Sequence, residues 1–373
     1  MRRSFQIVMT LSFVTYIGGF FALQLITKDK TFSELENRTL ATKPKFTTQK
    51  FFDGTYGREV ETYIADQFPV RDEFIAIKSN TERLLQKKEN NGVYIGKDDY
   101  FLQKFETPDL ELMKKNIDYI NKFGENFNLY FMLAPTATKV YEDKLPNYAT
   151  PYEEKFFIDK VVNGLNDKIH KVDVLDKLEA HEAEDLYYKT DHHWSTLGAY
   201  YGYTAFCEAY GIEPLPMEDF DRVIGSDAFY GSLFSKGNFT FARPDTVELF
   251  VPKDPEKLEV FYMADNKTTD TVYEMEQLEK KDKYTVFLGG NHPIITIKSD
   301  VNNGKKLAVI KDSYANAMIP FLTEQFEEIH VLDLRFLNMP IGTYMRENGI
   351  EDALMLYNVQ NFAVVNQLSL LGK

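Results

Sequence analysis

One stretch of the chain decides its fold, and it reads Leu307-Ala308-Val309-Ile310-Lys311-Asp312-Ser313-Tyr314-Ala315-Asn316. Its first four residues are apolar and predict a short strand that is buried on both faces of a sheet. A helix is expected from Tyr314 to Phe326. Because the strand ends before this helix begins, Ser313 lies at the carboxyl end of a central strand. Open α/β sheets place their functional sites at this position. Asp312 and Ser313 taken alone are more often an ordinary helix cap, so the stretch needs partners before it indicates a function.

The same alternation of strand and helix continues on both sides of this stretch. Strands that alternate with helices at this spacing form βαβ units, which give a parallel sheet with helices on both faces. We therefore predict an α/β fold with three layers. The expected strands are 129–134, 172–175, 306–310, 329–334 and 353–357, the expected helices are 110–123, 151–169, 314–326 and 341–348, and a hairpin is expected at 93–102.

Composition also divides the chain into parts. Residues 1–30 form an apolar N-terminal segment, and residues 31–90 are predicted to be a linker followed by helices. The α/β domain is expected over 91–373. Within it, residues from about 211 to 283 break the rhythm with scattered Gly and Pro, and we interpret them as an inserted cap region.

The N-terminal segment has the length of a membrane span. An uncharged run from Phe5 to Ile26 follows Arg2 and Arg3. About 22 residues at 1.5 Å each give roughly 33 Å of helix, which matches one hydrocarbon core. The run exceeds the apolar region of a signal peptide and lacks a small-x-small cleavage site. We therefore expect a retained single-pass anchor in the cell membrane. The alternatives are a cleaved signal peptide, which gives a secreted protein, and a buried soluble helix. The positive-inside rule places the long C-terminal part outside the cytoplasm.

Composition and charge exclude several classes of protein. The 373 residues are 44% hydrophobic and 14% aromatic, which is enough to bury a sizeable core and excludes disorder as the main state. The formal net charge of −14 argues against a nucleic-acid partner, because phosphate binding needs clustered Lys and Arg. Cys207 is the single cysteine, which excludes an internal disulfide, a cysteine-rich metal site and a CxxC redox motif.

Two of the six histidines are adjacent in Thr190-Asp191-His192-His193-Trp194-Ser195, beside the single tryptophan. An apolar helical stripe follows, so this segment is a loop before a helix. An aspartate two residues before a histidine can accept the Nδ1 hydrogen of its ring, which fixes the tautomer and leaves Nε2 free as a base. Ordinary capping and packing is the competing interpretation. A zinc site is less favoured, because no further Cys or His cluster has ligand spacing.

A third motif, Met355-Leu356-Tyr357-Asn358-Val359-Gln360-Asn361, ends another expected strand. The amide of Asn358 can donate to an oxyanion, as can the free N–H groups of a helix that begins at Ser313. We expect the three motifs to converge at one edge of the sheet, with Trp194 packed behind the histidine loop. His192 should point away from Ser313, since neighbouring side chains in an extended segment alternate.

Asp191-His192-His193-Trp194 resembles the signature of the bacterial DHHW proteins. These are similar to the SGNH-hydrolase-like acetyltransferase domains of the alginate O-acetylation proteins AlgJ and AlgX. The resemblance covers about residues 32 to 365. Further segments that carry it are Phe32-Ser33-Glu34-Leu35-Glu36-Asn37-Arg38, Asp66-Gln67-Phe68-Pro69-Val70-Arg71-Asp72, Asn91-Gly92-Val93-Tyr94-Ile95-Gly96, Gly289-Gly290-Asn291-His292-Pro293, Lys311-Asp312-Ser313-Tyr314-Ala315 and Asp333-Leu334-Arg335.

The resemblance implies a flavodoxin-like, circularly permuted SGNH-hydrolase fold, in which Asp-x-His precedes the serine. By motif match, Asp191 and His193 take the Asp and His roles, and Ser313 is the nucleophile. The oxyanion donors that the resemblance implies are then Ser313 and Asn358. Where the family commonly has Gly-Asp-Ser, this chain has Lys311-Asp312-Ser313, a difference that is expected to change access near the nucleophile but leaves the serine in place. Further residues expected near the site are His192, Trp194, Lys311, Tyr314, Asn291, His292 and Arg335.

The activity that the resemblance implies is acetyl transfer to an exopolysaccharide or a cell-wall glycan through an acetyl-Ser313 intermediate, without a metal or cofactor. The implied partners are a glycan acceptor and a membrane-bound O-acyltransferase that supplies acetyl groups. Two alternatives stay open. One is a carbohydrate or acetyl esterase of the SGNH type, which uses water as acceptor. The other is a non-catalytic surface assembly protein with a relic site, against which the intact Asp191, His193 and Ser313 count.

Overall fold

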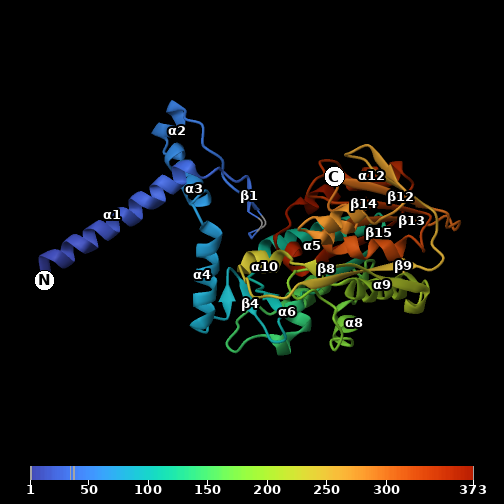
Figure 1. Ribbon diagram of the computed structural model, residues 1–373. Helices are drawn as coiled ribbons and strands as arrows, with labels where there is room; N and C mark the ends of the chain where they lie inside the picture. The colour runs from blue at the N-terminus through green and yellow to red at the C-terminus, as the bar shows by residue number, and fades with distance from the viewer. Residues whose placement is uncertain (1, 34, 37, 373) are drawn as a thin grey trace. The chain divides into compact units, whose positions relative to one another are not determined.

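The computed structural model of the chain describes residues 2–33, 35–36 and 38–372 (Figure 1). Two compact units are present. The first contains the described residues up to 90 together with 235–241, and the second contains 91–234 and the described residues from 242 onward. Glu34 and Asn37, which belong to the family-like segment at 32–38, lie outside the described residues. All residues expected at the functional site belong to the second unit.

An eight-stranded sheet forms the centre of the second unit, with the strand order β11-β10-β12-β14-β13-β15-β6-β7. Five neighbouring strands are parallel: β14 (Glu328–Leu332), β13 (Lys306–Lys311), β15 (Asp352–Asn358), β6 (Asn128–Ala134) and β7 (His170–Val172). Their apolar side chains are almost fully buried, as expected for strands that are covered on both faces. The prediction of an α/β fold with a parallel central sheet is confirmed for these strands, but the strand expected at 172–175 lies at His170–Val172 and a helix begins at Leu175.

Helices of different length connect and cover these strands. The α-helices are α5 (Leu110–Gly124), α6 (Ala137–Val140), α7 (Glu154–Gly164), α8 (Leu175–Glu179), α9 (Thr196–Tyr210), α11 (Ile319–Leu322), α12 (Ile341–Glu347) and α13 (Val359–Val364), and α10 (Ser232–Gly237) lies across the boundary between the units. Short 3-10 helices are η1 (Glu142–Lys144), η2 (Met217–Asp219), η3 (Met275–Glu279), η4 (Lys283–Val286), η5 (Ser313–Ala317) and η6 (Gln367–Gly372).

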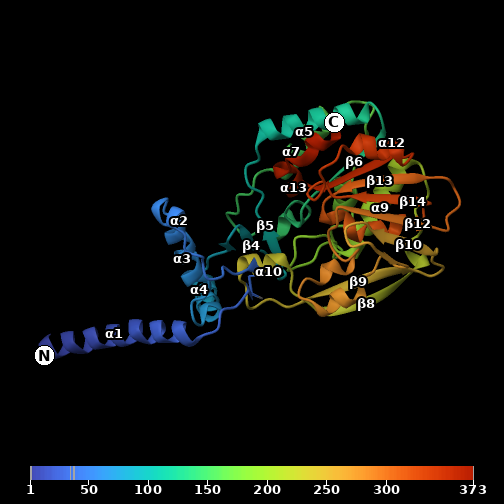
Figure 2. The same cartoon turned by 90° about the horizontal axis from the view of Figure 1, so that it is seen from above.

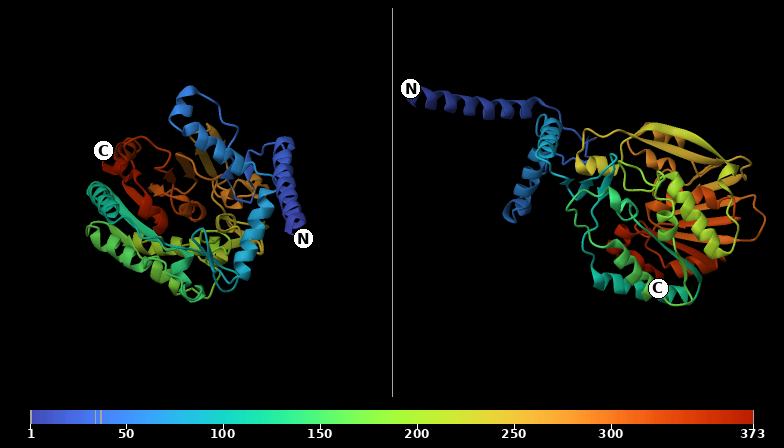
Figure 3. Two further views of the ribbon diagram at one scale, coloured as in Figure 1. Left: turned by 90° about the vertical axis from the view of Figure 1, so that its left-hand side faces the viewer. Right: turned by 90° about the horizontal axis from the view of Figure 1, so that it is seen from below.

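Helices cover both faces of the sheet. Successive residues of a strand point to opposite faces, so the contacts of two neighbouring residues of β6 show what covers each face. Tyr130 of β6 contacts Phe206 of α9, with ring centroids 5.6 Å apart. The next residue, Phe131, contacts Phe362 of α13 at 5.7 Å. Figure 2 shows α13 together with α5 and α7 near β6, and Figure 3 shows α9 lying across the sheet. Helix, sheet and helix therefore form the three predicted layers.

The opposite edge of the sheet is antiparallel, which corrects the expectation of a fully parallel sheet. β12 (Ile294–Ser299) pairs antiparallel with β14, and β10 (Leu258–Tyr262) and β11 (Lys267–Thr269) continue the antiparallel order. β10 and β11 belong to the segment that we interpreted as a cap region. Antiparallel neighbours need only short connections, so residues without a βαβ rhythm can still extend the sheet. The β8 (Phe220–Phe229) and β9 (Asp245–Pro252) strands of the same segment form a separate two-stranded antiparallel sheet.

The chain after β13 also differs from the prediction. In place of one helix from Tyr314 to Phe326, the structure has the 3-10 turn η5 followed by the short helix α11. Pro320 accounts for this difference, because proline lacks the N–H that an α-helix would bond to residue 316 and its ring clashes with that carbonyl. In a 3-10 turn the side chains at i and i+3 eclipse, so Ser313 and Asn316 share a face.

The first unit contains one long helix and several short elements. They are α1 (Arg2–Ile26), β1 (Phe32–Ser33), β2 (Arg38–Thr39), α2 (Thr48–Phe52), α3 (Thr55–Asp66), α4 (Arg71–Leu84) and β3 (Glu89–Asn90), whereas β4 (Val93–Ile95) and β5 (Phe101–Gln103) of the second unit form the predicted hairpin. By length and composition, residues Arg3–Ile26 can cross a membrane. This helix is therefore a candidate membrane anchor or signal sequence.

Candidate functional site

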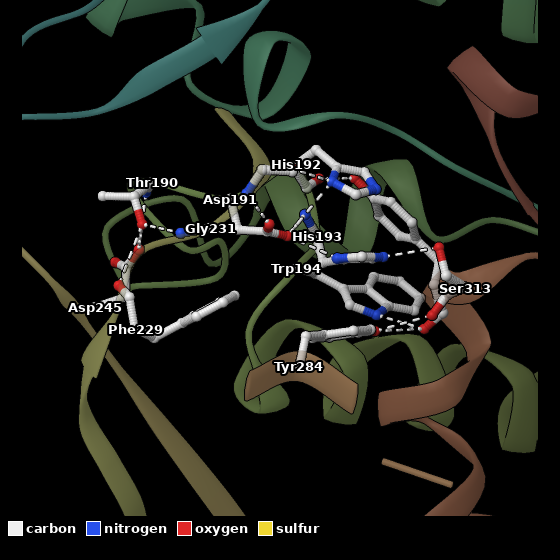
Figure 4. A network of polar contacts seen from close by, with 12 residues as sticks. Thr190, Asp191, His192, His193, Trp194, Phe229, Gly231, Asp245, Tyr284 and Ser313 are labelled. Carbon is white, nitrogen blue, oxygen red and sulfur yellow. Dashed lines mark hydrogen bonds and ion pairs between the residues drawn. The ribbon is translucent and has the colours of Figure 1, made fainter. Parts of the chain in front are cut away.

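Asp191, His193 and Ser313 form a continuous chain of contacts (Figure 4). Nδ1 of His193 lies 2.6 Å from Oδ1 of Asp191, and Nε2 of the same ring lies 2.8 Å from Oγ of Ser313. All three residues are buried, although Ser313 keeps 7% of its surface exposed. The geometry has a carboxylate orienting an imidazole whose second nitrogen reaches a hydroxyl, which is the arrangement that makes a serine nucleophilic.

Asp312 fixes the turn that carries Ser313. Its buried carboxylate accepts hydrogen bonds from the backbone N–H of Tyr314 at 2.9 Å and of Asn358 at 2.8 Å. It also accepts one from Nδ2 of Asn361 at 2.7 Å. These hydrogen bonds join the end of β13 to the end of β15. The turn that carries Ser313 is therefore held in place by two strands.

The loop that carries Asp191 is held by residues from a distant part of the chain. Oδ2 of Asp191 accepts the N–H of Ser232 at 2.6 Å, while Oδ1 accepts the N–H of His193 at 2.9 Å. Gly231 packs directly against Asp191, and a Cβ at position 231 would overlap the aspartate side chain. Asp245 accepts both the N–H and the hydroxyl of Thr190, at 2.8 and 2.6 Å. The segment around β8 and β9 thus supports the carboxylate.

Trp194 packs behind this loop and is fully buried. Its Nε1 donates to the carbonyl of Tyr314 at 2.9 Å, which ties the histidine loop to the serine turn. A Cβ at Gly202 of α9 would lie 2.8 Å from the six-membered ring of the indole. A Cβ at Gly198 would lie 3.0 Å from the Trp194 Cβ and would overlap the Leu186 carbonyl. Because these two positions of α9 are glycines, the indole can pack directly against the helix backbone.

Two tyrosines complete the surroundings of His193. The ring of Tyr284 stacks on the imidazole with centroids 3.7 Å apart and planes 6° apart, and its hydroxyl donates to the carbonyl of Ser313 at 3.0 Å. The hydroxyl of Tyr314 donates to the carbonyl of His192. The sequence named Tyr314 but carried no signal for Tyr284, Ser232 or Asp245, because these residues come from a segment without a recognisable rhythm.

Charge and burial together set the protonation of the site. Burial raises the pKa of the Asp191 carboxyl, but the charges and hydrogen bonds of His192 and His193 outweigh it and hold that pKa well below its usual range. Burial lowers the pKa of His193 to about 4, with a further contribution from the charge of His192 and an opposing one from Asp191. Neutral His193 donates Nδ1–H to Asp191 and offers a lone pair at Nε2, which is the state a general base needs.

His192 faces a different partner. Its Nδ1 lies 2.6 Å from Oγ of Ser232 and 3.4 Å from Oδ1 of Asp191, and its side chain is 29% exposed. Burial lowers its pKa, but the charge and hydrogen bond of Asp191 raise it by more, so that the net shift is upward. Asp191 therefore favours the protonated form of His192, and no described contact joins His192 to Ser313.

Lys311 lies buried beside the serine turn. Its Nζ donates to Oδ1 of Asn316 at 2.7 Å and of Asn291 at 2.9 Å, and it lies 3.4 Å from Oδ2 of Asp333. Burial lowers the pKa of Lys311 to about 8, against the opposing charge of Asp333. Because an ammonium group only donates, both asparagines must turn their oxygens toward it.

Two other expected neighbours have contacts outside the Asp191–His193–Ser313 chain. Arg335 forms a bidentate pair with Asp333, at 2.8 and 2.5 Å. His292 lies 3.3 Å from the Asp265 carboxylate. Arg335 thus pairs with the same Asp333 carboxylate that lies 3.4 Å from Lys311 Nζ, and burial lowers the pKa of His292.

Asn358 lies at the end of β15, as predicted, and its amide already has partners. Nδ2 donates to the carbonyls of Ala134 at 3.2 Å and Pro135 at 3.4 Å, and Oδ1 accepts from the N–H of Gln360 at 3.0 Å. To hold an oxyanion, the amide would have to exchange these bonds. Among the described residues, no hydrogen-bond acceptor is found for the backbone N–H of Ser313.

Asp191, His192 and His193 also offer three metal-ligand atoms within 4.8 Å of one another. The atoms include groups that already bond to each other, since His193 Nδ1 and Asp191 Oδ1 share one hydrogen bond. A cation held by these groups would compete with the hydrogen bond that orients His193. The chemistry of the donor set therefore fits proton transfer better than metal binding.

The fold and these contacts define an α/β protein with an Asp–His–Ser arrangement at the carboxyl edge of its sheet. The chain belongs to the DHHW family: the family model described as DHHW protein matches residues 36–126 and 124–332. A search of curated proteins gives no significant match.

Solved structures resemble the chain over most of its length. A DHHW family protein from Eubacterium siraeum has a TM-score of 0.64 and 27% identity, covering 76% of this chain and 96% of that one. PatB1 of Bacillus cereus, solved with a sulfonyl adduct, has a TM-score of 0.62 and 20% identity, covering 73% and 98%. The O-acetyltransferase domain of Pseudomonas putida AlgJ aligns with a TM-score of 0.47 and 15% identity, covering 74% and 94%. The first two comparisons show that the α/β fold is shared, and the third lies below the score at which a common fold is established.

Proposed function

We propose that the protein is a serine-dependent O-acetyltransferase that acts outside the cytoplasm on a polysaccharide or cell-wall glycan. The observation that carries this proposal is the pair of contacts made by one ring: His193 Nδ1 at 2.6 Å from Asp191 and Nε2 at 2.8 Å from Ser313. The order Asp191, His193, Ser313 along the chain also supports a circularly permuted SGNH-type fold.

The proposed reaction has two half-steps. In the first, Ser313 Oγ attacks the carbonyl carbon of an acetyl donor while His193 Nε2 takes the hydroxyl proton. The backbone N–H of Ser313 holds the oxyanion, with Asn358 as the second candidate donor once it releases its present acceptors. The bond to the leaving group then breaks, and the protonated His193 returns the proton to the departing atom. Acetyl-Ser313 remains.

In the second half-step a sugar hydroxyl attacks the acetyl carbon and gives its proton to His193 Nε2. Collapse of the tetrahedral intermediate releases the acetylated sugar and returns the proton to Ser313. Water in place of the sugar would give esterase chemistry with the same residues. The burial of Ser313 and His193 favours transfer, because a bound acceptor competes best where water has little access.

The compartment and partners belong to the same proposal. Helix α1 would anchor the protein in the cell membrane, so that the second unit works outside the cytoplasm. The acceptor would be a glycan, and a membrane-bound O-acyltransferase would pass acetyl groups across the membrane to Ser313. The net charge of −14 disfavours nucleic acid in this role.

The test combines covalent labelling with acetyl transfer. Because PatB1 was solved with a sulfonyl adduct, a sulfonyl fluoride is a suitable first probe, and intact mass should show one adduct on the native chain and none on Ser313→Ala. A chromogenic acetyl ester with candidate oligosaccharides should then yield acetylated sugar. Release of acetate without transfer would favour the esterase, and an unlabelled, inactive native chain would contradict both.

A further inference from the structure

The end of the long apolar helix is hydrogen-bonded to α3 and to the turn between α3 and α4, within the first unit. The hydroxyl of Tyr63 donates to the Asp29 carboxylate, at 2.9 and 3.0 Å. Gln67 Nε2 donates to the carbonyl of Lys30 at 2.8 Å, and its Oε1 accepts the N–H of the same residue at 2.9 Å. Lys30 Nζ also lies 3.4 Å from the Asp72 carboxylate. The chain therefore leaves α1 by a fixed path rather than by a free tether.

An aromatic cluster lies on the helix side of this polar attachment. Phe20 of α1 stacks on Phe68 with ring centroids 5.2 Å apart, and it contacts Phe74 at 5.8 Å. Phe68 and Phe74 contact each other at 5.9 Å. Both flank the corner between α3 and α4, so the corner packs directly on the apolar helix.

The depth of Phe20 follows from helix geometry. It lies six residues before Ile26, the last residue of α1, which corresponds to about 9 Å along the axis. If the apolar run fills a hydrocarbon core of about 30 Å, Phe20 lies inside the outer leaflet. Rings that touch it then lie at the depth of roughly 5–10 Å that interfacial helices reach. The Lys30–Asp72 pair lies beyond the end of α1, on the aqueous side.

The side chain between these two rings is unusual for a water-facing corner. Val70 is 50% exposed and has φ of 52°, a left-handed conformation that a β-branched residue adopts at a cost. Glycine or asparagine would fit this backbone more easily in water. An exposed apolar side chain at this position is favourable where lipid, rather than water, contacts it.

We propose that the α3–α4 corner, Phe68 to Phe74, is a membrane contact that rests on the outer leaflet of the bilayer crossed by α1. The inference rests on the proposed anchoring by α1. Its consequence is that the first unit sits on the bilayer in a defined orientation, with apolar contact rather than charge as the source of affinity.

The experiment uses the full chain in phosphatidylcholine nanodiscs with a nitrobenzoxadiazole label at one introduced cysteine. The native Cys207 is buried and serves as unlabelled background. A label at Val70→Cys should be quenched by spin-labelled lipid and shielded from iodide. Lys87→Cys, beyond the far end of α4, is the matched control and should be quenched by iodide only.

A label at Val14→Cys, in the middle of α1, separates two kinds of failure. If Val14 reports lipid and position 70 reports water, the corner contact is wrong and the anchor stands. If Val14 itself reports water, the anchor and the corner contact both fall.

Val70→Asn provides a variant that should keep the fold, because asparagine accepts the left-handed conformation. With the label at Phe74→Cys, this exchange should raise iodide quenching on the order of twofold, since less apolar surface enters the leaflet. Unchanged quenching in a folded variant, judged by circular dichroism, would overturn the proposal.

Discussion

At the residue scale, the first expectation concerns the assignment of the base. His193→Ala and Ser313→Ala should each lower kcat on the order of 10³-fold or more, because in the proposed reaction either change removes proton transfer to or from the nucleophile. The double variant should cost little more than either single one, since the two act as a unit. His192→Ala should keep most activity at pH 7. A dead His192→Ala with an active His193→Ala would reverse the assignment.

The second expectation at this scale is a pH profile. His193 acts as a base only when neutral, so activity falls as pH drops through its pKa, which burial and the charge of His192 lower to about 4. The acidic limb of kcat/KM should therefore lie well below the usual 6.5 of histidine. His192→Gln removes a neighbouring positive charge, which makes His193 easier to protonate. The acidic limb of kcat/KM of the His192→Gln variant should move to a pH about one unit higher than in the native protein. A shift to lower pH would contradict this electrostatic explanation.

Gly231 gives a third expectation. A methyl group at position 231 would overlap the Asp191 side chain, so Gly231→Ala must displace either the carboxylate or the backbone that bonds it. We expect kcat to fall at least tenfold, on the ground that a displacement of about 1 Å can cost on the order of 10² in rate. Gly211→Ala is a useful comparison for the loss of a glycine, because a Cβ at position 211 would meet no atom within 4 Å, although the φ of 82° makes the substitution strained. Equal kcat in the two variants would contradict the steric argument.

At the scale of elements, Glu154 shows how one buried carboxylate joins two helices. It begins α7 and accepts both the N–H of Thr136 at 2.6 Å and its hydroxyl at 2.8 Å, while Thr136 caps α6. Burial raises the pKa of Glu154 to about 7, although the Thr136 bonds oppose the shift. Between about pH 4.5 and 7 the folded state holds a proton that the unfolded state has lost, so this residue makes folding less favourable as pH rises.

Glu154→Gln should therefore raise the melting temperature at pH 8 and change it little at pH 5. The amide can still accept from the Thr136 N–H, and it carries no charge into the core. Glu154→Ala should be destabilising at both pH values by about 1–3 kcal/mol, because it leaves that N–H without a partner. Calorimetry of both variants at the two pH values checks the prediction, and a Gln variant that melts lower at pH 8 would contradict it.

The same scale shows what sequence could and could not predict. The strands near Leu129, Val309 and Leu354 were predictable because they are short, apolar and separated by amphipathic helices. The helix after Ser313 was predicted as continuous, although Pro320 in the sequence already opposed it. The antiparallel strands β10 and β11 carry no helix between them, so nothing local distinguishes them from a cap.

For the candidate site, the sequence supplied residues whose chemistry is local. Asp191 and His193 are two positions apart, and Ser313 follows a strand, so each could be named from its own neighbourhood. Tyr284 and Ser232 reach the site only through the tertiary fold, and their segments have no motif. An aromatic ring that stacks on an imidazole leaves no spacing signal, which is why such supporting residues escaped prediction.

At the scale of the whole molecule, the two units differ in how much they bury. Strand β13 has Leu307, Ala308, Val309 and Ile310 fully buried. In the first unit, α2 has no buried residue, α3 buries only Asp66 and α4 only Ser79. Regions with few buried apolar contacts open locally at a free energy far below that of global unfolding.

Hydrogen exchange of the full chain in nanodiscs should follow this difference. Amides of β13, β15 and β6 should exchange only through global unfolding, and amides of α2 and of the C-terminal half of α4 should exchange orders of magnitude faster. Within the first unit, the segment from Tyr63 to Phe74 should be the slowest, because hydrogen bonds from Tyr63 and Gln67 and the ring of Phe20 hold it. Equal protection of α2 and β13 would show that the units unfold as one. A corner that exchanges as fast as α2 would show that its attachment to α1 adds no stability.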